Sequence, residues 1–411
     1  MNTMQHITPL PRRVQPLPWE DFGSFLVRTA KHMDYETPHW ILKPETSSDQ
    51  INIWDLPVLS RQADYDFLSQ LLLVPETHLY QMTIHRFSPL LEPVLDERAS
   101  IQRRQHQRVN ASYRSRSIDH QLFYRNPGGF FLSKSLNIRI CPLCLTSTET
   151  YDHLYWRIKP LLTFPLHNVL LQGSCPICLK KWPIFRPSGI HCPSCFQPFH
   201  QHEKDHQTQN HPAFFSVLQG DALLLQRFGY EQGSRDRMDV SLAQDFRALL
   251  PPEEFFLLFR LCCTKIASLS REMLSTFLPP SFYEFLTLLK KNEDTTLRRN
   301  LPIQVAIAHW LFLGGETHFF AFLDTLNFLL REAHPHSLFR HFPCGTFASY
   351  TPTFRLLHQL HQRYRSLYEA QGIKALDARV LQRLQAFASS GSQGSKALEQ
   401  SVLQRRGQLV G

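Results

Sequence analysis

Three copies of one short pattern run through the middle of the chain: Cys141-Pro142-Leu143-Cys144, Cys175-Pro176-Ile177-Cys178 and Cys192-Pro193-Ser194-Cys195. Two cysteines separated by two residues can point both thiolates at one ion, at about 2.3 Å from each sulfur. The last two copies are separated by 13 residues, slightly short of the usual zinc-ribbon spacing. The sequence therefore predicts a closed Cys₄ zinc site made by Cys175, Cys178, Cys192 and Cys195. A closed tetrahedral shell leaves no position for water, so this ion is expected to be structural.

Disulfides and redox chemistry are the alternatives for these cysteines. Disulfides need an oxidising compartment, and residues 1–16 show no apolar run of the kind that a signal peptide carries. A redox pair explains one Cys-x-x-Cys pattern better than it explains three. Zinc is the better explanation, and a cytoplasmic location is expected.

A second, less complete ligand set comprises Cys141, Cys144 and His167. A fourth ligand is missing where it is expected, because Phe164 stands three residues before His167. His153 and His191 are the candidate substitutes. Two possibilities stay open: a second zinc ion, or an empty site that keeps its shape by packing.

The cysteine pairs, with Tyr155-Trp156-Arg157 and Leu166-His167 between them, resemble the TniQ/TnsD family of transposition target selectors. The start of the chain resembles the family's opening signature, through Pro16-Leu17-Pro18-Trp19-Glu20-Asp21-Phe22 and Ser24-Phe25-Leu26-Val27-Arg28-Thr29-Ala30. The resemblance covers about the first 200 residues. It departs at Phe164, where the family usually has cysteine.

The resemblance implies an adaptor in transposition. Such a protein links target recognition by an RNA-guided CRISPR effector of the Cascade type to a TnsC-like AAA+ ATPase regulator, and hence to the transposase. It also implies a homodimer, and a contact with the regulator through Trp19, Glu20 and Phe22. Longer members of the family bind an attachment site in DNA directly, so a sequence-specific DNA-binding selector is the alternative.

The net charge of +9 is concentrated between residues 98 and 139, where nine basic residues face one acid. Arginines among aromatic and small polar residues suit phosphates and stacked bases, although a solvated linker has a similar composition. The residues predicted to contact DNA or RNA are Arg98, Arg103, Arg104, Arg108, Arg114 and Arg116.

Apolar residues recur at helical spacing over most of the chain, so the predicted fold is mainly α. The predicted parts are an N-terminal helical domain (1–138), a zinc-ribbon region with short strands (139–200), a linker (201–211), an all-helical domain (212–388) and a flexible tail (389–411). A helix is expected to open at Trp19. Residues 64–83 predict a helix-turn-helix or a simple helical hairpin. Residues 255–259 are expected at the centre of the C-terminal core.

Several catalytic motifs are absent from the sequence. It has no phosphate-binding Gly-x-x-x-x-Gly-Lys-Ser/Thr loop, no His-Glu-x-x-His pair and no Gly-x-Ser-x-Gly elbow. A dispersed carboxylate site stays possible on sequence alone, but acids are sparse. No uninterrupted apolar run approaches the ~18 residues of a membrane span. A non-enzymatic protein without membrane partners is therefore expected.

Overall fold

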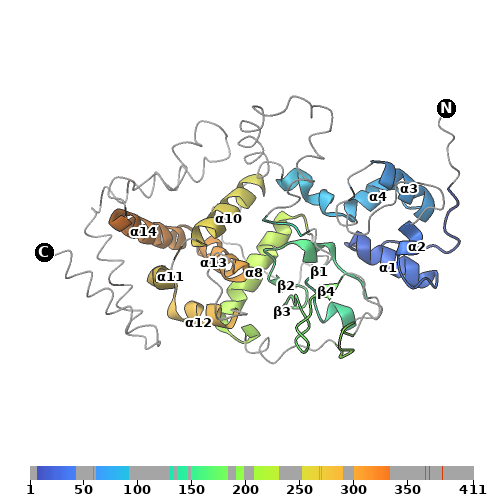
Figure 1. The fold of residues 1–411 in the computed structure, drawn as a ribbon. Coiled ribbons are helices and arrows are strands. Elements are labelled where there is room, and N and C mark those ends of the chain that lie inside the picture. The colour runs from blue at the N-terminus through green and yellow to red at the C-terminus, as the bar shows by residue number, and fades with distance from the viewer. Residues whose placement is uncertain are drawn as a thin grey trace. The chain divides into compact units, whose positions relative to one another are not determined.

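The computed structural model describes part of the chain, and the elements below lie within that part. The described residues are 7–42, 59, 62–91, 130–133, 137–146, 150–183, 191–198, 208–230, 252–267, 269, 271–289, 300–333, 366, 370 and 382. They are mainly helical with a few short strands (Figure 1), as the sequence predicts. The six nucleic-acid candidates from Arg98 to Arg116, residues 201–207 of the linker, most of 353–387 and the tail lie outside them.

The chain divides into two compact units. One consists of Met1–His206 with Leu224–Tyr230, and the other of Gln207–Leu223 with Glu231–Gly411. The elements of the first unit are α1 (Phe22–His32), α2 (His39–Leu42), α3 (Gln62–Leu72), α4 (Glu76–Gln81), the 3-10 helices η2 (Ile84–Phe87), η4 (Cys144–Thr146) and η5 (Leu154–Arg157), and strands β1 (Asn137–Ile138), β2 (Thr163–Phe164), β3 (Val169–Leu170) and β4 (Trp182–Pro183). The predicted helical domain and zinc-ribbon region thus belong to one unit.

Helix α1 begins three residues later than Trp19, the predicted start. Trp19 has a left-handed backbone with φ of 61°, which is incompatible with an α-helix. Asp21 is the N-cap, and its carboxylate accepts a hydrogen bond from the Gly23 N–H. The apolar face of α1, with Phe22, Phe25, Leu26 and Ala30, is buried in the core shared with α2, α3 and α4.

The proline-rich segment before α1 lies across this core. Its Leu10 N–H donates to the carbonyl of Leu71 at 2.9 Å, and Leu10 and Val14 pack against the buried residues. Arg12 forms an exposed ion pair with Asp34 at 2.8 Å. The segment is therefore part of the unit that it precedes.

Helices α3 and α4 form a hairpin. Leu73 turns the chain with φ of 54°, Val74 is buried, and Pro75 precedes the first residue of α4. The exposed residues of α4 are Glu76, Thr77, His78, Tyr80 and Gln81. This geometry is that of a helical hairpin, and its use as a DNA-reading helix-turn-helix stays a prediction.

Two small antiparallel ladders support the cysteine pairs. Strand β1 pairs with β4, with Ile138 opposite Trp182. Strand β2 pairs with β3, with Phe164 opposite Val169, and the turn between them carries His167. The short strands predicted near residues 138 and 140 are present, since Ile140 also bridges to Gln172.

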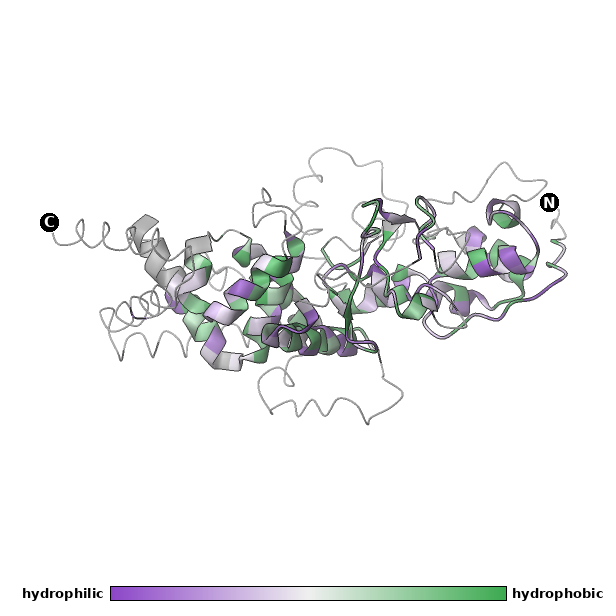
Figure 2. Ribbon diagram, turned by 90° about the horizontal axis from the view of Figure 1, so that it is seen from below, coloured by the Kyte–Doolittle hydropathy of each residue, from purple (hydrophilic) through white to green (hydrophobic). Residues whose placement is uncertain are grey.

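The second unit is helical in its described part. Its elements are α8 (Pro212–Arg227, whose last residues belong to the first unit), α10 (Pro252–Ile266), α11 (Arg271–Phe277), α12 (Pro280–Leu289), α13 (Leu301–Leu313) and α14 (Gly315–Ala333). Figure 2 shows polar and apolar residues mixed along most of the helices. None of the described helices combines the length and the apolar character that crossing a bilayer requires.

Helix α13 shares the centre of this core with the predicted phenylalanines of α10. Every residue from Ile303 to Phe312 is buried, and Phe312 contacts Phe255 and Phe259 with ring centroids 5.2 and 5.6 Å apart. The core also contains a polar pair, in which His309 Nε2 lies 2.9 Å from Asp221 Oδ1. These two side chains tie α13 to α8.

Candidate metal centres

The four cysteines of the second and third patterns meet in one cluster. Cys175 Sγ lies 3.6 Å from Cys195 Sγ, and Cys178 Sγ lies 3.7 Å from Cys192 Sγ. All four sulfurs lie within 4.8 Å of one another. Sulfurs at about 2.3 Å from one tetrahedral ion are about 3.8 Å apart, whereas a disulfide requires about 2.05 Å. The observed distances therefore fit one ion shared by four thiolates, and this donor set suits zinc.

The two halves of this cluster repeat one backbone arrangement. In the first, the N–H of Cys175 donates to Lys180 O and the N–H of Leu179 donates to Cys175 O. In the second, the N–H of Cys192 donates to Gln197 O and the N–H of Phe196 donates to Cys192 O. The residue after each second cysteine is left-handed, with φ of 61° at Leu179 and 57° at Phe196. Each turn thus presents both of its sulfurs to the same point.

Backbone N–H groups also point at the sulfurs. Burial raises the pKa of the Cys175 thiol to about 12, although hydrogen bonds from the N–H groups of Cys178 and Ile177 act to lower it. At Cys192, burial raises the pKa, but the N–H groups of Ser194 and Cys195 together with the thiols of Cys195 and Cys178 outweigh it and lower the pKa to about 7. Hydrogen bonds to a thiolate favour its charged form, which is the form that binds a metal.

Cys141, Cys144 and His167 form a second, three-membered group. Each sulfur lies 3.3 Å from His167 Nδ1. The hydrogen bond from Cys144, opposed by burial and helped by His167, lowers the pKa of Cys141 to about 5. The pKa of Cys144 is raised by the same hydrogen bond and by burial. Both cysteines are buried and His167 is exposed, so these donors also fit zinc.

The expected substitutes for a fourth ligand do not join this group. Among the described residues, the cluster contains only two cysteines and one histidine. His153 packs against Phe164 instead, with ring centroids 5.1 Å apart, and burial lowers its pKa to about 4. His191 bridges to Pro198 in the Cys₄ region.

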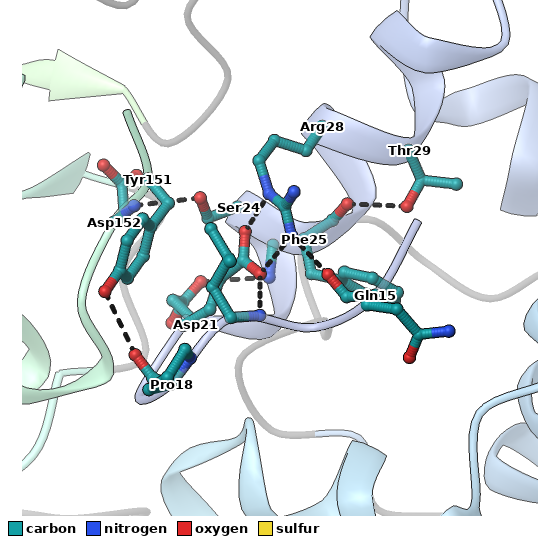
Figure 3. Close-up of polar contacts among 12 residues, drawn as sticks. Gln15, Pro18, Asp21, Ser24, Phe25, Arg28, Thr29, Tyr151 and Asp152 are labelled. Atoms are coloured by element: carbon teal, nitrogen blue, oxygen red, sulfur yellow. Dashed lines mark hydrogen bonds and ion pairs between the residues drawn. The ribbon is translucent and has the colours of Figure 1, made fainter. Parts of the chain in front are cut away.

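A polar cluster that sequence reasoning missed joins the start of α1 to residues 151–157. Arg157 Nε donates to Asp21 Oδ2 at 2.6 Å, and the two side chains are 1% and 2% exposed. Around this ion pair, Ser24 Oγ accepts from the N–H of Asp152 (Figure 3). The N–H of Asp21 donates to Asp152 O. Asp21 and Arg157 are 136 residues apart, and no local pattern predicts their contact.

Comparison with known protein families identifies one family model that matches part of this chain. Residues 11–171 match the model of the TniQ family. The chain contains a TniQ domain. The matched range includes the Asp21–Arg157 cluster and the Cys141, Cys144 and His167 group, whereas the Cys₄ cluster lies beyond it. The chain matches no curated protein and no solved structure.

The three residues predicted to contact a partner differ in their exposure to solvent. Phe22 is 0% exposed in the core. Glu20 is 1% exposed and pairs with Arg28, whose Nε lies 2.7 Å from Glu20 Oε1; burial raises the pKa of this carboxyl. Trp19 is partly exposed, and Arg86 lies over its ring at 3.6 Å from the centroid. Phe22 and Glu20 therefore support the fold, and Trp19 alone offers surface to a partner.

Arg139 is the one basic residue of the 98–139 stretch that the structure describes, and it has a structural role. Its guanidinium donates to the carbonyls of Ile158 and Leu161 in the TniQ domain. The nucleic-acid-binding candidates Arg98, Arg103, Arg104, Arg108, Arg114 and Arg116 remain predictions, because they lie outside the described residues.

Proposed function

We propose that this protein is a non-enzymatic adaptor in transposition. It connects a target-recognition complex, an RNA-guided CRISPR effector ribonucleoprotein, to an AAA+ ATPase regulator that recruits the transposase. The observation that carries the proposal is the TniQ domain over residues 11–171, which marks a transposition-associated protein. A homodimer would present each contact twice.

The construction of the first unit supports this role. One hydrogen bond, from the Leu10 N–H to Leu71 O, ties the N-terminal segment to α3, and a buried ion pair ties α1 to residues 151–157. Four sulfurs lie within reach of one ion in the following region, and an ion bound there would hold that region together. Two weak contacts on one rigid body raise each other's effective concentration, so specificity can arise without catalysis.

The N-terminal segment is the proposed contact for the regulator. Leu10 and Val14 face the core, while Pro11 and Arg13 are exposed beside them. Removing the whole segment would expose core residues, so a charge reversal is the cleaner test. Arg13→Glu should reduce regulator recruitment and leave effector binding unchanged. Lys31→Glu, a reversal at an exposed position of α1, is the matched control.

A pull-down with purified regulator and effector measures both contacts in one experiment. Loss of both contacts in Arg13→Glu, or of neither, would contradict the proposed division of labour. Equal loss in the Lys31→Glu control would show that net charge alone decides recruitment.

The alternative is a selector that binds a DNA site directly, through the α3–α4 hairpin or the basic stretch. The described surface of α4 gives it little support, because the exposed residues include Glu76 and no lysine or arginine. A gel-shift series separates the two functions. The adaptor predicts weak, nonspecific binding of duplex DNA that becomes site-specific with the effector, whereas a direct selector predicts nanomolar binding with a defined footprint and a steep salt dependence.

An enzymatic function predicts metal-dependent cleavage of DNA by the purified chain. Incubating supercoiled plasmid with the protein and Mg²⁺ or Mn²⁺ tests this directly. Nicking that copurifies with the protein and persists in independent preparations would overturn the non-enzymatic proposal.

A further inference from the structure

The two metal centres differ in the number of donors that the chain supplies. The Cys₄ cluster has four, whereas Cys141, Cys144 and His167 make three, and no fourth Cys, His, Asp or Glu among the described residues joins them. Zinc sites with four protein ligands are closed, while sites with three keep a position for water or another ligand. We infer that an ion in the three-donor centre has one exchangeable position, which accepts a thiolate or imidazole from outside the domain.

Phe164 stands where a fourth ligand is expected, and among the described residues no other side chain takes that place. Phe164 is 0% exposed, and its backbone ends strand β2 at the turn that carries His167. Its ring contacts the rings of both His167 and His153, at 5.8 and 5.1 Å between centroids. An apolar ring therefore stands beside the centre, and a phenyl group cannot bind zinc.

His153 is held in an aromatic cluster and not at the ion. Besides Phe164, its ring packs against Tyr151 and Trp156, with centroids 4.6 and 5.4 Å away. Its Nδ1 is buried without a hydrogen-bond partner, and the ring is packed among these three aromatic side chains. Binding the ion would require His153 to give up these contacts.

The centre is accessible from one side. Cys141 and Cys144 are buried, but His167 and its neighbours Leu166 and Asn168 are exposed, as is Leu143 in the cysteine turn. An external donor can approach over this exposed turn. Sulfur and imidazole nitrogen are the donor types that complete Cys₃His and Cys₂His₂ shells, and the source is a side chain of another protein molecule or a small thiol.

Cobalt substitution of the full-length protein tests the inference. One equivalent of Zn²⁺ fills the Cys₄ cluster first, and Co²⁺ then reports on the three-donor centre through its visible spectrum. The double variant Cys141→Ser/Cys144→Ser supplies the blank. N-acetylcysteine is the thiolate probe and free imidazole is the nitrogen probe.

The expected result is a saturable change in the cobalt bands of the wild-type protein on adding either probe. N-acetylcysteine adds a third thiolate to the two from Cys141 and Cys144, so the thiolate-to-cobalt charge-transfer absorption should rise by about half. The blank should not respond. Bands of a four-coordinate ion that ignore both probes would overturn the inference. So would cobalt bands that change in His153→Phe, a variant that keeps an aromatic ring, because they would show that His153 supplies the fourth ligand.

Dilution distinguishes the sources of the external donor. If a second copy of the chain donates, the cobalt spectrum without probe changes with protein concentration, and size-exclusion chromatography shows a metal-dependent oligomer. If the spectrum is independent of concentration, the donor is a different protein or a small thiol. The response to the probes then still shows whether the centre has an exchangeable position.

Phe164→Cys provides an independent test by closing the shell within the chain. Because removing even an outer-shell partner costs about 10–100-fold in metal affinity, adding a ligand should tighten Zn²⁺ binding by more than about tenfold. The response to both probes should then disappear. Phe164 is fully buried, so circular dichroism must first show a folded variant; if it does not fold, the wild-type titration decides.

Discussion

The buried ion pair between Asp21 and Arg157 yields the sharpest prediction about stability. Its nitrogen and oxygen atoms are 2.6 and 3.2 Å apart in the two contacts, and both side chains are almost fully buried. Asp21→Asn removes the charge and keeps an oxygen that can accept from the Gly23 N–H. Removing one partner of a buried pair costs about 3–5 kcal/mol, because the other charge stays buried and unpaired. We expect a loss in this range.

Asp21→Ala should cost about 1 kcal/mol more than Asp21→Asn, since the N-cap of α1 is lost as well. The double variant Asp21→Asn/Arg157→Met should recover most of the loss, because no unpaired charge remains. The matched control is Arg12→Ala, which breaks the ion pair with Asp34. Those two side chains are 58% and 81% exposed, so that change should cost less than about 1 kcal/mol.

Hydrogen exchange followed by mass spectrometry measures the loss of stability in the segments that the ion pair joins. Peptides that cover α1 and residues 151–157 should lose protection together in Asp21→Asn, while the second unit should be unchanged. If Asp21→Asn loses no more protection than Arg12→Ala, or if the double variant is no more stable than the single one, the reasoning is wrong.

Three further predictions concern packing, pH and metal. Gly220→Ala should destabilise the second unit by about 1–3 kcal/mol in urea unfolding, because a Cβ at this position would lie 2.2 Å from the His309 ring. Gly173→Ala is the control and should be nearly neutral, because the nearest atom to its Cβ would be 3.5 Å away. Burial lowers the pKa of His318, so its contribution to stability is present above about pH 6.5 and falls as the pH drops; His318→Gln should flatten the pH dependence of the melting temperature. Cys192→Ser should reduce the zinc content by one ion per chain and lower the melting temperature, and an unchanged zinc content would contradict the Cys₄ assignment.

The parts of the structure that the sequence predicts well are those with local signals. A two-residue spacer between cysteines is a local pattern, and the structure brings Cys175, Cys178, Cys192 and Cys195 together. Helical periodicity likewise predicts a helical region over residues 212–388, and the structure has α10, α12 and α13 there. Helix α13 is buried on every side, so its apolar residues mark it as a core helix although they define no single face.

The contacts that the sequence does not predict join residues far apart in the chain. Nothing near Asp21 indicates Arg157, since a buried pair is visible only when α1 lies beside residues 151–157. The same contact joins the predicted helical part to the predicted zinc-ribbon part, and both lie in the first unit. The family resemblance implies a partner contact at Glu20 and Phe22, but these residues follow the left-handed Trp19 and are buried in the interior.

Metal analysis of the freshly purified protein decides whether four sulfurs hold an ion that stabilises the first unit. We expect at least one zinc ion per chain, retained during dialysis against a weak chelator, and a loss of ordered structure in that unit when a strong chelator removes it. A zinc-free protein that melts cooperatively at an unchanged temperature after chelation would contradict this expectation.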